Sequence, residues 1–508
     1  MKRKVLPCFM ALSMTLTAVP NVAMAEDGSM NEAGTVVETT TETEPAEEPA
    51  EEVGASGVAE TTEETVVEAT EIQPAMVMAT EEVAAKNGVV KSVGTAEDLN
   101  KAVLEAQDGV ETTSQLTEDI VVEKPMTVKE GQNIILDMDG HEITVTESFS
   151  TRIFTNNGTL TIKGNGKVDV TAAGANGYGA VNNFGTLTVV NGEYIGVKAS
   201  NASVFYNRNG GTATFIDPII EGGGGSVATE VNTTTEIHGG RYSNETYPAI
   251  ENRGDMLITG GTFENTSCSS CDERWGYTIR SGNGSDSAYL KIQGKAEDSV
   301  KVTGVQGGLA VIGGTADIYN GSYKTVPCEI EEHGGKSAYY AGYFTGESYK
   351  TSTNIYGGTF QSASRNALQI GNGNPAPDSG AGKESTVMIS GGTFIGGDAA
   401  QTAIKVDDAE NAIGVANITG GTFSSNVEEF VDPSSSIVKD EVTGEWVTKP
   451  IPVEDAVASI GEKNYKTLAA AVKNAAAGDT VKLIKSVELT ETLTIDKGID
   501  FDLNAISI

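Results

Sequence analysis

The chain has 508 residues, of which 60 are Gly and only 6% are aromatic, and its formal net charge is −37. An acidic surface of this kind repels nucleic acid and anionic lipid, so neither is expected as a partner. The few aromatic residues leave little bulk for large globular cores, and the composition favours a repetitive architecture of small units.

The N-terminus has the pattern of a secretory signal. Basic residues at 2–4 precede an apolar run and a small-residue cleavage site at 23–25, so residues 1–25 are predicted to be a signal peptide. A membrane anchor is the alternative, but the apolar run is short of a full span and no second long run follows. We therefore expect a secreted protein without a transmembrane helix.

The next segment is acidic and has little to bury. Residues 26–85 contain 17 Asp and Glu residues and no Lys or Arg. Such a segment repels itself and cannot form a core, so residues 26–88 are predicted to be a disordered acidic Glu/Thr/Pro-rich linker.

A helix is predicted over residues 95–107, followed by strands at 119–128 and 133–145. Apolar residues from Leu99 to Ala106 recur at i, i+3, i+4 and i+7, and Thr95 is a suitable N-cap. We assign residues 89–145 as a short capping helix with the first strands, because the open end of a repeat protein needs a cover.

One short phrase recurs through residues 146–432. It reads Gly-Gly-Thr-Phe at 257–265, 354–362, 388–396 and 417–425, with looser copies at 188–196, 236–244 and 317–325. An apolar residue, usually Ile, stands two positions before the glycine pair, polar residues alternate with it, and an aromatic residue follows. This period-two pattern indicates strands. A 60-residue gap between Phe263 and Tyr323 is expected to hide an irregular unit.

Several copies are preceded by an apolar pair and an Asn-rich turn, as at 180–188 and 249–259. Each unit therefore reads as strand, tight turn, strand, tight turn. Stacked coils explain why the same residue type returns at the same phase, whereas a sandwich of hairpins, the alternative, does not require it. We predict an all-β parallel solenoid of about 13 coils and about 60 Å, with Ile facing inward and each Phe lying on the next. The glycines are expected where φ is positive or backbones approach closely.

The opening of the chain returns near its end. Leu468, Ala471, Val472 and Ala475 repeat the helical spacing, and residues 500–505 correspond to 135–140. We predict a linker at 433–452 and the start of a second, truncated β-helix module at 453–508. Ala505 stands where the first copy has Gly140, an unfavourable change if φ is positive.

These repeats resemble the pectin-lyase-like right-handed parallel β-helix superfamily, and more narrowly repetitive bacterial cell-surface proteins of adhesin type. The segment at 136–141, Leu-Asp-Met-Asp-Gly-His, is similar to the opening strand of many such helices. The resemblance covers about residues 90–430. It implies a right-handed parallel β-helix on a bacterial cell surface, and it leaves open whether the chain binds or cuts polysaccharide.

Residues for catalysis are sparse. A hydrolase of this superfamily would carry further motifs around Asp407-Asp408. A lyase would need a calcium site near Arg280, which has Asp272 and Glu273 upstream, but no spacing here assures the six to eight oxygen ligands that calcium takes. We predict no catalytic residues, no metal and no cofactor; the alternative is an extracellular polysaccharide lyase or glycoside hydrolase.

Histidine and cysteine give no recognisable constellation. The CxxC pair is open to three interpretations: a local disulfide, a redox pair or half of a metal site. The residues concerned are His141, His238 and His333, the pair Cys268 and Cys271, and Cys328.

Two irregular stretches, 264–277 and 324–344, interrupt the repeat and carry aromatic residues. Flat aromatic faces can stack on sugars without reactive groups. We predict ligand binding at Trp275, Tyr277, Tyr339 and Tyr343; the alternative is that such residues belong to the core of their coil. The overall hypothesis is a monomeric, non-catalytic surface protein that binds extracellular glycans or ligands on host or neighbouring cells.

Overall fold

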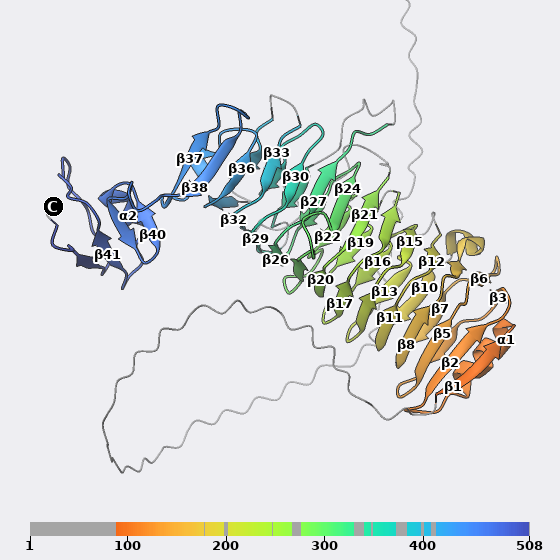
Figure 1. The fold of residues 1–508 in the computed structure, drawn as a ribbon. Coiled ribbons are helices and arrows are strands. Elements are labelled where there is room, and N and C mark those ends of the chain that lie inside the picture. The colour runs from red at the N-terminus through yellow and green to blue at the C-terminus, as the bar shows by residue number, and fades with distance from the viewer. Residues whose placement is uncertain are drawn as a thin grey trace, which may run out of the picture. The chain divides into compact units, whose positions relative to one another are not determined.

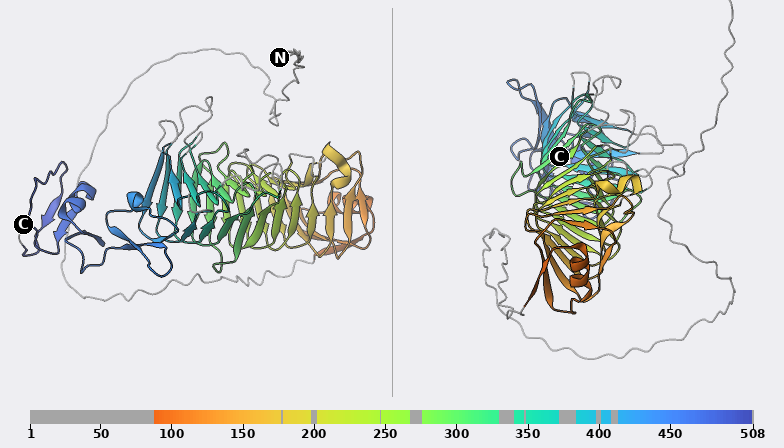
Figure 2. Two further views of the ribbon diagram at one scale, coloured as in Figure 1. Left: turned by 90° about the horizontal axis from the view of Figure 1, so that it is seen from above. Right: turned by 90° about the vertical axis from the view of Figure 1, so that its right-hand side faces the viewer.

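The computed structural model describes residues 88–506 except for gaps at 177, 198–201, 246, 267–275, 330–339, 347–348, 372–383, 398–400 and 408–412. The predicted signal peptide and nearly all of the acidic linker fall outside these residues. Most of the described chain is a parallel β-helix, in which strands stack side by side along one axis (Figures 1 and 2). Each coil visits three sheets in the order A, B, C.

Within the described residues, sheet A has thirteen strands, all paired in parallel. They are β1 (Val89–Val93), β2 (Glu111–Leu116), β5 (Asn133–Asp137), β8 (Thr159–Lys163), β11 (Thr186–Val189), β14 (Thr212–Phe215), β17 (Thr234–Ile237), β20 (Asp255–Ile258), β23 (Tyr289–Ile292), β26 (Gly314–Ile318), β29 (Thr351–Ile355), β32 (Ser385–Ile389) and β35 (Gly414–Ile418).

Sheet B follows the glycine turns and is parallel up to β36. Its parallel strands are β3 (Ile120–Val122), β6 (Glu142–Val145), β9 (Lys167–Asp169), β12 (Glu193–Ile195), β15 (Ile219–Gly222), β18 (Arg241–Asn244), β21 (Gly261–Asn265), β24 (Val300–Gly304), β27 (Ser322–Thr325), β30 (Thr359–Gln361), β33 (Thr393–Ile395) and β36 (Gly421–Phe423).

Among the described residues, sheet C has eleven parallel strands, which close the complete coils. They are β4 (Met126–Val128), β7 (Arg152–Asn156), β10 (Gly179–Asn183), β13 (Phe205–Asn207), β16 (Val227–Thr229), β19 (Ile250–Asn252), β22 (Ile279–Ser281), β25 (Leu309–Val311), β28 (Gly342–Phe344), β31 (Leu368–Ile370) and β34 (Ile404–Val406). The parallel solenoid predicted from the repeats is therefore confirmed, and the right-handed sense expected for it is the one that nearly all parallel crossovers adopt.

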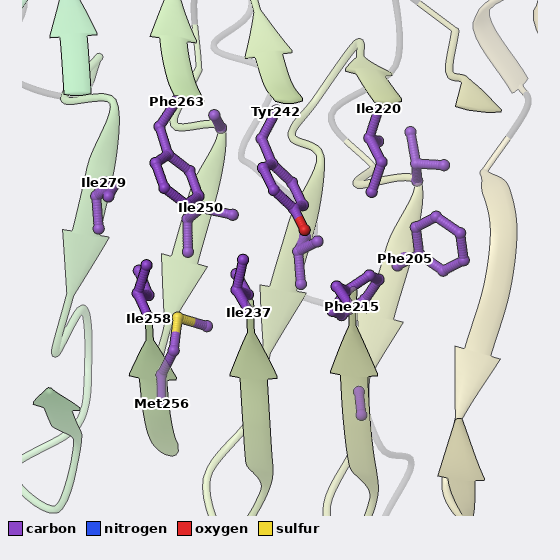
Figure 3. Packing of buried hydrophobic residues seen from close by; sticks show 14 of the residues in the cluster. Phe205, Phe215, Ile220, Ile237, Tyr242, Ile250, Met256, Ile258, Phe263 and Ile279 are labelled. Carbon is purple, nitrogen blue, oxygen red and sulfur yellow. The ribbon is translucent and has the colours of Figure 1, made fainter. Parts of the chain in front are cut away.

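The repeated phrase builds the core. Ile237 and Ile258 lie on neighbouring strands of sheet A, and Tyr242 and Phe263 lie beside each other on sheet B (Figure 3). The aromatic rings stack from coil to coil as predicted, with centroids 5.0 Å apart for Tyr242 and Phe263. Where the aromatic residue is Tyr, its buried hydroxyl donates to a backbone carbonyl three residues earlier, for example Tyr242 Oη to Gly239 O at 3.0 Å.

The two glycines of the phrase meet different demands. A Cβ at Gly391 would lie 2.3 Å from the carbonyl oxygen of Tyr356 in the preceding coil, so the first glycine allows a close backbone approach. Gly392 has a φ of 105°, so the second supplies a conformation that other residues rarely adopt. The sequence predicted both a close backbone approach and a positive φ at this turn. It did not assign either role to a particular glycine.

Among the coils from Tyr194 to Phe423, two carry no aromatic residue at the stacking position. Val302 fills it between Phe263 and Tyr323, which confirms the irregular unit expected in that gap. Ile220 fills it between Tyr194 and Tyr242, in a coil that the aromatic spacing did not reveal. Aliphatic side chains can replace the ring because the position needs apolar volume rather than a specific shape.

The Asn-rich turns between sheets C and A form a buried ladder. Asn156 Nδ2 donates to Asn183 Oδ1 at 2.7 Å, and Asn183 Nδ2 donates to Asn207 Oδ1 at 2.8 Å. All three side chains are buried and also donate to backbone carbonyls. The turn residues thus hold successive coils in register, because each buried amide depends on the coil beside it.

The N-terminal end of the solenoid is covered by α1 (Ala96–Leu104), which contacts strands β1 to β4. Thr95 caps the helix by accepting from Asp98 N at 3.1 Å, and Leu99, Ala102 and Val103 are buried, as predicted. The helix ends three residues before the predicted end because Gln132 Nε2 donates to the carbonyls of Val103 and Ala106, at 3.0 and 2.9 Å.

Residues 433–452, predicted to be a linker, form a hairpin instead. Strands β37 (Ser435–Lys439) and β38 (Trp446–Pro450) pair antiparallel, and β38 pairs antiparallel with β36 at the last coil of sheet B. The hairpin thus covers the edge of β36. An exposed edge strand can pair with another molecule and cause aggregation, so proteins commonly cover such edges.

The C-terminal residues have their own small core. They form β39 (Ala458–Ile460), β40 (Lys463–Tyr465), α2 (Leu468–Asn474), β41 (Thr480–Leu483) and β42 (Asp500–Asp502) (Figure 1). As in the first opening, the helix buries Leu468, Ala471 and Val472, and the two strands that follow it pair in parallel, β41 with β42 as β2 with β5. Residues 486–495 alternate apolar and polar side chains, a pattern typical of strands, but they contain no strand.

The turn after β42 repeats the turn after β5. Asp502 Oδ1 accepts from Asn504 N at 2.9 Å, and Asp137 Oδ1 accepts from Asp139 N at 3.2 Å. Ala505 has a φ of 58° where Gly140 has 87°. The Gly-to-Ala change was predicted to be unfavourable if φ is positive, and φ is positive at Ala505. A left-handed conformation of this kind costs alanine about 1–2 kcal/mol.

Candidate functional site

Two of the four predicted ligand-binding residues are described, and both are buried. Tyr277 is 1% exposed and Tyr343 6%. Their rings stack on each other with centroids 5.4 Å apart, in a small apolar cluster with Ala310 and Ile312. Neither ring offers an open face to solvent, so glycan stacking at this pair is not what the arrangement supports. Trp275 and Tyr339 lie outside the described residues.

A second tyrosine stack lies on the surface. Tyr319 and Tyr356 follow β26 and β29, are 37% and 46% exposed, and have ring centroids 4.6 Å apart with planes at 16°. Each stands directly before a glycine-containing turn, where the strand has just placed Ile318 or Ile355 inside the core. The tyrosine that follows therefore points outward and stays partly exposed.

Polar groups on the outer face of sheet A lie beside this stack. Asp317 accepts hydrogen bonds from Tyr289 Oη and from Asn354 Nδ2, both at 2.8 Å. Lys291 Nζ lies 5.2 Å from the ring centroid of Tyr319, within range of a cation–π contact. Partial burial, together with the hydrogen bond to Asp317, raises the pKa of Tyr289 to about 12. The patch is thus organised before any ligand arrives.

A groove of about 500 Å³ begins at Tyr319 and follows the glycine turns of the later coils. Its floor includes Gly358, Gly392 and Gly421, which carry no side chains. The hydroxyl-bearing residues Thr393 and Thr422 line it and are neighbours in register on sheet B.

The walls of the groove come from outside the repeat. Lys449, on the hairpin strand β38, lines the groove. Glu297, from the loop between β23 and β24, also lines it. Both side chains are exposed. The groove therefore forms because the glycines of the turns carry no side chains, whereas the hairpin and the loop between β23 and β24 contribute side chains beside them.

The residues considered for catalysis are engaged in contacts between neighbouring strands. Arg280 Nε donates to Glu251 at 2.6 Å, and the two residues are partners in register on sheet C. Asp407 accepts from Gln369 Nε2 at 2.6 Å and lies 3.3 Å from Lys405 Nζ. Arg280 lies on β22 and Asp407 directly follows β34, so the two residues belong to different coils. The other candidates, Asp272, Glu273 and Asp408, lie outside the described residues.

The described histidines lie in different coils. His238 contacts Glu236 and Thr259, at 3.0 and 2.9 Å, and His141 lies 3.4 Å from Asp119. Within the described ranges, no group of three or more His, Cys, Asp or Glu residues is placed to hold a metal ion. Cys328 is buried, whereas His333 and the pair Cys268 and Cys271 lie outside those ranges. Neither α1, with nine residues, nor α2, with seven, is long enough to cross a membrane, and the described chain offers no other candidate.

The sequence contains a signal for the tyrosine stack that was not used. The position before the glycine pair is polar in most copies, as in His238, Thr259 and Ser390, but it is Tyr in the two consecutive copies at 317–321 and 354–358. Because that position faces outward, two aromatic residues there predict an exposed stack.

The site offers flat apolar ring faces, hydroxyl groups and backbone polar groups. These features are typical of surfaces that bind sugars by stacking and hydrogen bonding. Comparisons of the chain with protein-family models, with curated proteins and with solved structures found no match.

Proposed function

We propose that this protein works outside the cell as a non-catalytic, adhesin-like surface protein of the pectin-lyase-like β-helix type, and that it binds glycans. The observation that carries the proposal is the exposed stack of Tyr319 and Tyr356, in which Tyr319 also lines a groove that follows the glycine turns. A stack of large apolar rings open to water is costly unless something covers it, so it favours a binding role.

The chemistry of the groove suits a neutral sugar chain. The axial C–H groups of a pyranose ring can pack on the face of Tyr356, and its hydroxyls can pair with Thr393, Thr422 and nearby backbone groups. Acidic polymers are disfavoured because the chain carries a net charge of −37. The two ionic side chains at the groove, Glu297 and Lys449, balance each other.

The rest of the chain fits display at a distance. The predicted signal peptide exports the protein, and the acidic segment at 26–88 would extend and hold the solenoid away from its point of attachment on a bacterial surface. Thirteen strands in sheet A correspond to a rod of about 60 Å at ~4.8 Å for each step. A rigid monomeric rod of this kind can present one site without a change of shape.

A glycan array probed with the purified full chain tests the proposal. We expect binding to neutral oligosaccharides, and we expect the double variant Tyr319→Ala/Tyr356→Ala to lose it. A matched control, Tyr178→Ala, removes another exposed tyrosine far along the chain and should leave binding unchanged. Loss of signal in both variants would contradict the assignment of the site.

The competing function, a polysaccharide lyase or glycoside hydrolase, is tested on the same preparation. We expect no release of unsaturated or reducing sugar from acidic or neutral polysaccharides. Turnover that is abolished by Arg280→Ala or Asp407→Asn would overturn the proposal and place the active site on the outer face of sheet C.

A further inference from the structure

The exposed column of tyrosines ends at Ser390. Tyr319, Tyr356 and Ser390 occupy the same position in three successive coils, each directly after the Ile that ends a strand of sheet A. Tyr356 N donates to Ile318 O at 2.8 Å. In the next coil Ser390 N donates to Ile355 O at 2.9 Å. The backbone register therefore continues, while the side chain changes from tyrosine to serine.

The two ends of the column have different neighbours. Strand order places β23 and β29 on opposite sides of β26, so Lys291 and Tyr356 flank Tyr319 from opposite sides. Lys291 Nζ lies 5.2 Å from the ring centroid of Tyr319. At the other end, Tyr356 stacks on Tyr319 and, within the described ranges, on no other ring. The face of Tyr356 that is turned toward Ser390 is thus the open end of the column.

The hydroxyl groups of the following coils are turned away from this end. Ser390 Oγ donates to Ile355 O at 3.5 Å. Thr419 Oγ1, at the same position one coil later, donates to Ile389 O at 3.3 Å. Both side chains are small and bond to the backbone of the preceding coil, so neither takes the place of a third ring.

The column also sets the orientation of a ring that extends it. The rings of Tyr319 and Tyr356 are within 16° of parallel and their centroids are 4.6 Å apart, close to the step of ~4.8 Å between coils. Their faces therefore point along the solenoid axis, and a pyranose stacked on Tyr356 must face the same way. Successive rings of an extended sugar chain lie edge to edge, so the chain has to leave from an edge of the stacked ring.

The two edges of this ring position differ. On one side lies Met388, 37% exposed on the outer face of β32, two residues before Ser390. On the other side Gly391 and Gly392 carry no side chain and lead to Thr393, which lines the groove. A chain that passed straight through would meet Met388, whereas a chain that ends here can leave over the glycines.

We infer that the site binds a chain end: the terminal pyranose of a neutral glycan stacks on Tyr356 over Ser390, and the second unit lies over the glycine turn toward Thr393. This inference rests on the proposed function and adds which part of the glycan is bound. A site for internal units would gain affinity with every further unit, whereas a site for the terminal unit gains little beyond the second.

Calorimetric titration of the full chain with cellobiose, cellohexaose, maltose and maltohexaose tests the inference. For the linkage that binds, we expect the disaccharide and the hexasaccharide to have molar affinities within about twofold of each other. Ser390→Tyr should weaken binding about tenfold or more, because a third tyrosine covers the stacking face. The variant should fold, since the two preceding coils carry tyrosine at the same position.

Two control variants keep the outcomes distinct. Gln293→Tyr adds a ring at the other end of the column, at an exposed residue, and should leave affinity unchanged. Ser390→Ala keeps the position open and should bind like the parent chain. Binding that survives Ser390→Tyr, or a hexasaccharide that binds more than tenfold tighter than the disaccharide, would overturn this inference alone. If none of the four sugars binds the parent chain, the proposed function fails and this inference fails with it.

Discussion

Two pairs of stacked tyrosines in this molecule have nearly the same geometry and opposite surroundings. Tyr277 and Tyr343 stack at 5.4 Å and 9° and are buried, whereas Tyr319 and Tyr356 stack at 4.6 Å and 16° and are exposed. Tyr343 lies within a strand of sheet C, between neighbours in register on both sides, while the exposed pair stands at turns made of glycine. The neighbours of an aromatic residue, rather than the residue itself, decide whether it stabilises the fold or presents a surface.

The largest effect is expected at the buried pair. Tyr277→Ala removes a buried ring from the cluster around Ile312 and should lower the free energy of unfolding by about 3 kcal/mol, as other large-to-small core changes do. Urea denaturation measures the change, and Tyr277→Phe is the control that keeps the ring. A variant as stable as the parent chain would remove the contrast between the two pairs.

At the exposed pair, a substitution should weaken ligand binding rather than lower the free energy of unfolding. Tyr356→Ala is expected to weaken oligosaccharide binding about tenfold, or about 1.4 kcal/mol, because one stacking face is lost. Its melting temperature should stay close to that of the parent chain, since the ring is half exposed. Calorimetric titration gives the affinity, and Tyr356→Phe should retain it; equal weakening in both variants would argue against stacking.

A smaller effect is expected on the floor of the groove. Thr393→Val replaces a hydroxyl by a methyl group of similar shape and should weaken binding two- to fivefold, the contribution of one hydrogen bond of about 0.5–1 kcal/mol. Thr386→Val makes the same change on the outer face of sheet A, outside the groove, and should have no effect. An unchanged affinity for Thr393→Val would place the sugar on the rings alone.

The smallest expected signal is the titration of Tyr289 beside the exposed pair. Partial burial and the hydrogen bond to Asp317 favour the neutral phenol and raise its pKa from 10.0 to about 12. The resulting stabilisation is fully present below pH 10 and is lost as the pH rises through about 12. The tyrosinate absorbance of the parent chain, minus that of Tyr289→Phe, should titrate near 12; a midpoint near 10 would show that the hydrogen bond is absent in solution.

The sequence was informative about the repeat because every copy obeys the same local physics. Ile before the glycine pair and an aromatic residue after it must face inward in each coil, and both the close approach at Gly391 and the positive φ at Gly392 follow from the tight turn. The helix at Thr95 was equally predictable, since its cap and its apolar spacing are both local.

The candidate site was not predictable in the same way. The groove needs the hairpin strand β38 beside the turns of earlier coils, and nothing local in residues 446–450 indicates that they pair with β36. Ligand binding by the aromatic residues of the irregular stretches requires exposed rings, but Tyr343 lies on a strand, stacks on Tyr277 and is buried. Exposure depends on which segments meet in space, and that information is not contained in a single repeat.

Hydroxyl-radical footprinting with and without a bound neutral oligosaccharide tests the central claim most directly. The extent of oxidation of each tyrosine reports its solvent exposure, so one experiment measures the exposure of both tyrosine pairs. We predict that Tyr319 and Tyr356 are oxidised in the free protein and protected by the sugar, while Tyr277 and Tyr343 are protected in both states. Equal oxidation of Tyr319 and Tyr356 with and without a sugar that binds would contradict the account.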